Sequence, residues 1–259
     1  MPSYIGPLDS LQAVSWTTAE SMTPAPRYTF QDAPARRWAF TSSRLERGAI
    51  REWSVEFSGT NRDKTILEGL TTGVYGNGPF VYVPEGATLT NVLTPAQSRM
   101  AAFKNAGSMT TVGGYSPVSL TGGASVVLAD EVPVAPGGPV TVTVDAIGAS
   151  TTLTAQVKNA SGGVLSTVTG KSNGSGFLER VSAAVPSVPR LGRYLTISAA
   201  GYNVLSQPQV TWTEEPVPFE IGGGAAAVVI SEFTADWRIF ETATGESWRN
   251  MSVKIVEVG

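Results

Sequence analysis

The sequence predicts a mainly β protein in which a continuous β-sandwich is inserted into a discontinuous outer domain that carries one helix. Three observations lead to this fold class. The 259-residue chain has 15% charged residues, 28 glycines and 17 prolines, a composition typical of short strands and turns. One segment, after residue 60, has the period of an amphipathic helix. Aromatic residues are frequent toward both ends of the chain and sparse between about 99 and 215.

The N-terminal 26 residues are rich in proline, serine and threonine and show little periodicity, so we expect an extended arm or loop. Two short strands are expected next, at 27–30 and 36–41, because aromatic residues recur in both. Residues 31–34 contain Asp and Pro and are expected to form the turn between them.

Residues 50–83 carry the clearest pattern, a strand followed by a helix and a second strand. Trp53, Val55 and Phe57 alternate with polar residues, which predicts a half-buried strand. A helix then begins at a cap formed by Thr60 or Asn61, and one apolar stripe runs along it: Ile66, Leu67, Leu70 and Val74.

The helix is expected to end at Gly73, because glycine favours the conformation that closes a helix. Asp63 lies in its first turn, where a carboxylate stabilises the positive end of the helix dipole. A turn at 77–79 leads into a second strand at 80–83, which Pro84 terminates.

The segment from 99 to 215 predicts the inserted β-sandwich. Seven short runs of strand-forming residues follow one another with glycine-rich turns between them, a spacing typical of sandwiches. We expect strands at 124–128, 140–144, 152–157, 164–168, 176–181, 194–198 and 209–213.

Alternation of aromatic and polar residues returns after Pro216, with Phe233, Ala235, Trp237 and Ile239 sharing one face of a strand. A closing strand is expected at 251–255. We therefore predict an outer domain made of residues 1–95 and 217–259, with the sandwich inserted between them. Gly222–Gly224 is interpreted as a linker, because it lacks the pattern of a phosphate-binding loop.

The composition argues against an enzyme. The chain has no histidine and no cysteine, which excludes serine–histidine triads, histidine-ligated metals and cysteine-ligated zinc. Two adjacent carboxylate pairs remain, Asp130–Glu131 and Glu214–Glu215, but neighbouring residues of a strand point to opposite faces and suit solvation better than shared proton transfer. No calcium-binding loop pattern occurs. We predict no catalytic residue, no metal and no cofactor.

Charge and hydropathy limit the partners. The net charge is −3, with both signs scattered, so nucleic acid is not an expected ligand. No run of eighteen apolar residues occurs, and the N-terminus shows no secretory leader, so we expect neither a membrane segment nor export by a signal peptide.

The aromatic residues have two interpretations. Three aromatic residues of the insert could either stack on carbohydrate or pack in the core, and the sequence does not decide between the two roles: Tyr115, Tyr202 and Trp212. For the tryptophans of the outer domain, core packing or a subunit interface is the expected role: Trp38, Trp53, Trp237 and Trp248.

Residues 51–98, with the Gly78-Pro79-Phe80 turn and the run from Thr90 to Pro95, resemble the equivalent part of minor tail proteins of long-tailed phages that infect actinobacteria. The strands between 225 and 258 fit the discontinuous arrangement of that family. Within the insert, residues 134–138 and 207–212 resemble jelly-roll modules of the carbohydrate-binding type.

The resemblance implies a distal tail protein of the virion. Its outer domain would be a tail-tube-like β-sandwich or barrel, assembled as a ring, expected to be a hexamer, between the tail tube and the tail-tip or hub proteins of the baseplate. The insert would face outward for decoration or contact with host cell-wall carbohydrate, and the protein would be made in the host cytoplasm. Two alternatives are a carbohydrate-binding protein on a β scaffold and a hydrolase that uses carboxylates alone.

Overall fold

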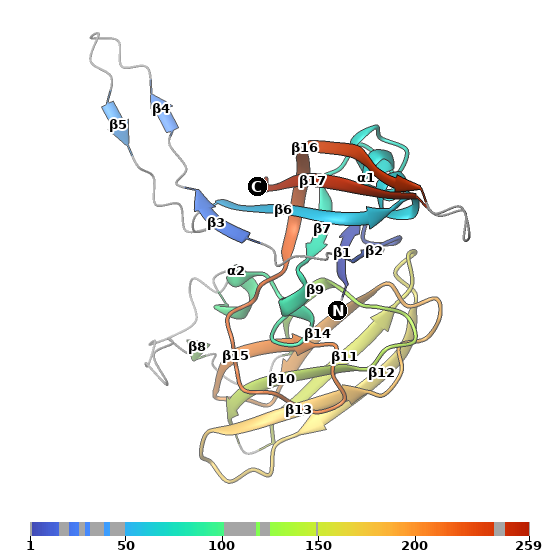
Figure 1. Cartoon of the computed structure of the whole chain (residues 1–259). Helices are drawn as coiled ribbons and strands as arrows, with labels where there is room; N and C mark the ends of the chain where they lie inside the picture. The colour runs from blue at the N-terminus through green and yellow to red at the C-terminus, as the bar shows by residue number, and fades with distance from the viewer. Residues whose placement is uncertain are drawn as a thin grey trace. The chain divides into compact units, whose positions relative to one another are not determined.

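The computed structural model describes residues 2–15, 21–25, 29–31, 39–41, 50–100, 118–119, 125–148, 150–240 and 247–258. These residues form a mainly β protein with three antiparallel sheets of four or more strands, one short hairpin and two α-helices (Figure 1). The predicted fold class is confirmed. None of the described helices is long and apolar enough to cross a bilayer.

The chain divides into two compact units. The sandwich unit comprises Ser3–Gln12 and Val81–Ala226, and the helix unit comprises Ala13–Phe80 and Ala227–Gly259. Both units are discontinuous in sequence. Residues 81–95, which the sequence analysis assigned to the outer domain, therefore lie in the same unit as the insert.

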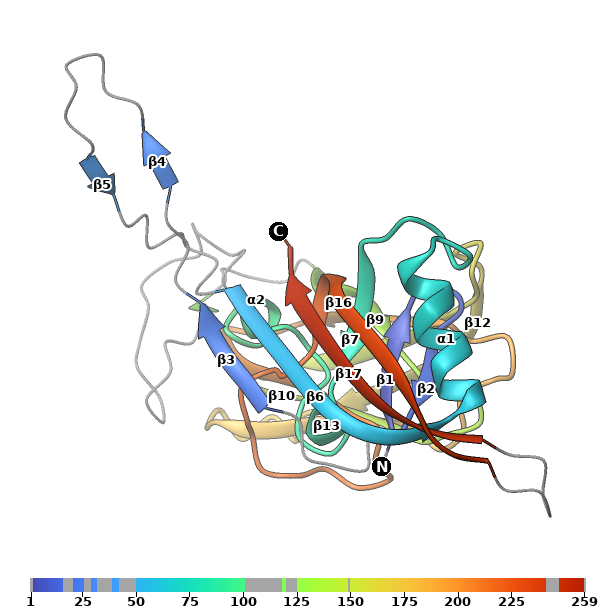
Figure 2. The same cartoon turned by 45° about the horizontal axis from the view of Figure 1, so that its top comes forward.

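The helix unit is built on an antiparallel sheet with the strand order β16-β17-β6-β3. Its strands are β3 (Ser21–Ala25), β6 (Ile50–Thr60), β16 (Ala225–Phe240) and β17 (Ser247–Glu257), and β4 (Thr29–Gln31) pairs with β5 (Ala39–Thr41) in a separate hairpin. The predicted half-buried strand is confirmed, because Trp53, Val55 and Phe57 are buried on one face of β6. Helix α1 (Asn61–Thr71) contacts β6 and β17, as can be followed in Figure 2.

A capping box fixes the start of α1. The Thr60 hydroxyl accepts from the Asp63 amide, and the Asp63 carboxylate accepts from the Thr60 amide at 3.0 Å, so two otherwise unpaired amides are satisfied. The helix ends where the sequence predicts, because the cap Thr72 directly precedes Gly73. The placement of Val74 on the apolar stripe is wrong, since Val74 lies beyond the helix with 76% of its surface exposed. Gly73 supplies the left-handed conformation, with a φ of 81°.

The sandwich unit contains two four-stranded antiparallel sheets, with the strand orders β13-β10-β15-β8 and β12-β11-β14-β9. All seven predicted strands of the insert are present, with shifted ends. The bounds are β8 (Val118–Ser119), β9 (Val126–Pro133), β10 (Val140–Ile147), β11 (Thr152–Lys158), β12 (Val164–Lys171), β13 (Glu179–Val185), β14 (Tyr194–Ala200) and β15 (Val204–Thr211).

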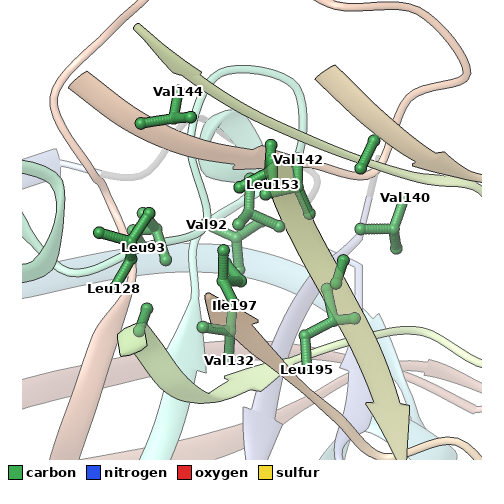
Figure 3. Packing of buried hydrophobic residues seen from close by; sticks show 14 of the residues in the cluster. Val92, Leu93, Leu128, Val132, Val140, Val142, Val144, Leu153, Leu195 and Ile197 are labelled. Carbon is green, nitrogen blue, oxygen red and sulfur yellow. The ribbon is translucent and has the colours of Figure 1, made fainter. Parts of the chain in front are cut away.

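A single apolar cluster fills the sandwich unit. Leu153, Leu195 and Ile197 are completely buried and meet the valines of β10 across the core (Figure 3). Val92 and Leu93, which follow the short η1 (Glu85–Thr88) and precede α2 (Pro95–Ser98), belong to the same cluster. The connection after β7 (Phe80–Val83) therefore packs as part of the sandwich core.

The N-terminal segment is not the extended arm that the sequence predicted, at least for its described residues. Ser3–Gly6 form β1, which pairs antiparallel with β7 (Phe80–Val83), and Gln12–Val14 form β2. Ile5 is completely buried. Pairing with a strand more than 70 residues away satisfies the backbone of this segment, and local composition carries no signal of such a partner.

We predict that Leu195→Ala destabilises the sandwich unit by about 2–5 kcal/mol, because it leaves a cavity at a completely buried position. The control is Leu191→Ala, at a leucine that is 62% exposed, which should change the unfolding free energy by less than about 0.5 kcal/mol. Urea unfolding followed by circular dichroism measures both. Equal losses in the two variants would contradict the core packing described above.

Candidate functional site

The predicted carbohydrate-contact residues occupy different environments. Tyr115 lies outside the described residues. Tyr202 is only 6% exposed and belongs to the core cluster, so its ring is not available for stacking on a ligand. Trp212 is half-buried and packs edge-to-face on Tyr4, with ring centroids 4.7 Å apart. For Tyr202, core packing is therefore the observed role.

The two carboxylate pairs lie at the surface, and one of their members is hydrogen-bonded. The side chain of Thr196 donates to Asp130 and, with other contacts, holds the pKa of that carboxyl below its ordinary value. Glu131, Glu214 and Glu215 are exposed. No group of three metal-ligating side chains occurs among the described residues.

A buried polar network lies on the outer face of the sheet β13-β10-β15. Arg180 on β13 donates to Asp145 on β10 at 2.8 Å and to the Thr143 hydroxyl at 2.7 Å. It also donates to the side-chain oxygen of Gln209 on β15, a residue that is 1% exposed, and its guanidinium lies 5.9 Å from the Phe219 ring. The network joins three strands through charge-assisted hydrogen bonds.

The same network holds the two connections that enter and leave the sandwich. The Gln209 amide donates to the carbonyl oxygens of Thr90 at 2.6 Å and Pro218 at 2.9 Å. Thr90 lies in the connection that enters the sandwich, and Pro218 lies in the connection that leaves it. A single buried side chain on β15 therefore fastens both to the sheet.

Asn91, which is completely buried, makes a second set of hydrogen bonds that join the connections to β15. Its amide nitrogen donates to the Glu220 carbonyl at 2.8 Å, and its side-chain oxygen accepts from the Val210 amide at 3.1 Å. The two connections and β15 meet at this residue. We call Asn91, Gln209 and Gly222–Gly224 the junction.

The glycine run of the junction is packed rather than open, which corrects its interpretation as a linker. The Gly223 amide donates to the Asn91 carbonyl at 2.9 Å, and the Gly224 amide donates to the Leu93 carbonyl at 3.1 Å. A Cβ on Gly222 would lie 2.1 Å from the Leu93 oxygen, and one on Gly224 would lie 2.0 Å from the Val92 oxygen. Only glycine permits two backbones to approach this closely.

Sequence analysis did not single out Asn91, Gln209 or Arg180. Polar residues in strand-like runs are expected on a solvated face, and nothing in the sequence indicates that two connections cover this one. The triple glycine was the available signal, since glycine in such a position also indicates close backbone approach.

A second polar arrangement organises the loop between β12 and β13. The Glu179 carboxylate accepts from the Ser175 hydroxyl, from the Ser175 amide at 2.9 Å and from the Asn173 amide at 2.6 Å. The side-chain hydrogen bond from Ser175 is the largest cause of a pKa for Glu179 below its ordinary 4.5. Phe177, in the same loop, is 78% exposed.

No protein-family model and no curated protein matches this chain. Among solved structures, it is similar to the crystal structure of the infectious bursal disease virus VP2 subviral particle. That similarity covers 100% of this chain and 71% of that chain, with 11% sequence identity and a TM-score of 0.22. A TM-score this low carries no argument about fold or function.

We predict that Gly222→Ala lowers the thermal stability of the sandwich unit, because the added Cβ would lie 2.1 Å from the Leu93 carbonyl oxygen, so the backbone would have to shift. Gly86→Ala is the matched control, since a Cβ at Gly86 meets nothing within 4 Å. Differential scanning calorimetry should show a lower midpoint for the first variant and little change for the second. Equal midpoints would contradict the packed junction.

We also predict a pH-dependent loop. Because the pKa of Glu179 is lowered in the folded protein, its stabilisation is complete above the unfolded value of about 4.5 and is lost as pH falls through the folded pKa. NMR shifts of the Ser175 and Asn173 amides should titrate below pH 4.5. In Glu179→Gln this titration should disappear; its persistence would assign it to another group.

Proposed function

We propose that this chain is a structural subunit of a phage tail: the helix unit assembles into the distal ring that joins tail tube and tail tip, and the sandwich unit decorates the ring or contacts the host. One observation carries the proposal. The two halves of the helix unit are separated in sequence by the sandwich, yet they complete one antiparallel sheet with one capped helix. This is the organisation that the resemblance to distal tail proteins implies.

The sheet of the helix unit suits assembly. Strands β17 and β6 pair without a register shift from Trp248↔Thr60 to Val256↔Glu52, which makes a long and regular platform. Arg51 on β6 reinforces its end by a two-pronged ion pair with Glu257 on β17, at 2.9 and 3.0 Å. Rigid sheets of this kind can close rings by pairing or packing with those of neighbouring copies.

The outer strand β3 offers an edge for such pairing. It is the terminal strand of its sheet, and Met22 on it is 53% exposed. Exposed edge strands can pair with other chains, and Pro24 of β3, which has no amide to donate, confines such pairing to the residues before it. We propose a second copy of this chain as the neighbour in the ring, with tail-tube and tail-tip proteins above and below it.

The enzymatic alternative has less support. The carboxylates that the sequence offered are dispersed or exposed, and Asp130 accepts a hydrogen bond from a threonine rather than facing a second carboxyl group. The carbohydrate-binding alternative is favoured by one observation: one outer face of the sandwich carries hydroxyl and amide groups without internal partners among the described residues.

We predict that the purified chain forms rings, with a hexamer expected, in native mass spectrometry and in negative-stain images. Met22→Lys should shift the population toward monomer, because a lysine on an edge strand opposes strand addition. The control is Val74→Lys, which places the same charge at a residue of the same unit that is 76% exposed. Monomers of the unmodified protein at all concentrations would count against the ring, and unchanged rings in Met22→Lys would exclude β3 as the contact.

A further inference from the structure

The outer face of the sheet β12-β11-β14-β9 carries a regular array of hydroxyl and amide groups. Along β11, Leu153, Ala155 and Val157 are completely buried, so the residues that alternate with them point away from the core. On β14, Leu195 and Ile197 face the core, and Thr196 between them points the other way although it is only 9% exposed. We define the hydroxyl face as Thr152, Thr154, Gln156, Lys158, Thr167, Thr169, Tyr194, Thr196 and Ser198.

Strand register aligns these side chains in rows across the sheet. Thr154 is paired with Thr169 on one side and with Ser198 on the other. Gln156 is paired in the same way with Thr167 and Thr196. Neighbouring rows are about 6.8 Å apart along a strand, and residues within a row are about 4.8 Å apart. The face is thus a lattice of donors and acceptors.

Most of these groups are not used inside the protein. Within the described residues, Thr154, Gln156 and Ser198 make no side-chain hydrogen bond, whereas Thr196 donates to Asp130. The other sheet of the sandwich differs, because Thr143, Gln209 and their neighbours are engaged with one another and with the connections. One face is occupied by the chain itself, and the other keeps its hydrogen-bonding capacity available.

An aromatic ring stands at one end of the lattice. Tyr194 is half-buried, and the ammonium group of Lys158, its partner across the strands, lies 6.0 Å from the ring centroid. The positive charge of Lys158 is offset by nearby Asp130, whose ionised form it favours. Thr152 is paired with Lys171 at the opposite end of the array. The face therefore has neutral polar groups at its centre, one aromatic ring, and its lysines, Lys158 and Lys171, at its two ends.

We propose that the hydroxyl face binds a neutral glycan chain, whose hydroxyls exchange hydrogen bonds with Thr154, Gln156 and Ser198 and whose apolar ring face packs on Tyr194. Side-chain hydroxyls and amides both donate and accept, as sugar hydroxyls do, and an aromatic ring offers the apolar surface that a sugar ring needs. This inference rests on the proposed function only for the origin of the glycan, which would be the surface of the host cell.

A protein partner fits this face less well. Protein interfaces have apolar centres and polar rims. Here the order is reversed, since the centre is threonine, serine and glutamine, while the exposed valines Val127 and Val164 lie opposite Ser198 and Lys158 toward the margins. Nucleic acid would require a basic surface with several neighbouring cations. This face has Lys158 and Lys171 at opposite ends, and the carboxylate of Asp130 lies near the first of them.

Affinity electrophoresis of the full chain in gels containing xylan, dextran or galactomannan, together with an array of neutral and acidic oligosaccharides, tests the proposal. We expect binding to at least one neutral glycan. Tyr194→Ala should weaken that binding at least about tenfold, through loss of the stacking surface. The double variant Thr154→Val and Gln156→Ala should weaken it to a similar extent while keeping strand-forming side chains at the first position.

Phe177→Ser is the matched control, because it removes an aromatic ring that is more exposed than Tyr194 and lies in the β12–β13 loop rather than on the face. It should bind as the unmodified chain does. No retention by any glycan, binding only to acidic glycans, or loss of binding in Phe177→Ser but not in Tyr194→Ala would overturn the proposal. Ring formation is measured separately by native mass spectrometry, so either conclusion can fail without the other.

Discussion

The sandwich unit depends on the hydrogen bonds that Asn91 and Gln209 make at its junction. A sheet with polar side chains on its outer face can be covered only if those groups find partners, because a buried unsatisfied group costs about 1–3 kcal/mol. Both side chains donate to carbonyls of the connecting segments that cover them. The glycines then allow the two connections to touch through their backbones.

This arrangement has a consequence for how the chain can carry an insert. The segments that enter and leave the sandwich are fastened to one another and to β15, so the two ends of the insertion are held side by side. Strands β6 and β17 of the other unit can then pair without depending on the length of the inserted sequence. An insertion whose ends are close together leaves the host sheet undisturbed.

The two outer faces of the sandwich differ in how their polar groups are used, although both contain threonine. On the sheet β13-β10-β15, Arg180 donates to Asp145 and Gln209 and so joins the strands. On the sheet β12-β11-β14-β9, the hydroxyls and amides keep their capacity for an external ligand. Threonine occurs on both faces, but only on the first do connecting segments cover the polar groups and bond to them.

Local patterns in the sequence determined the strands of the insert, the buried face of β6 and the capped helix, because alternation and capping act between residues close in the chain. Tertiary structure alone decided that residues 3–6 pair with β7 and that the triple glycine is packed. It also decided which threonine-rich face is covered. These features depend on contacts between segments more than 70 residues apart, for which no local pattern exists.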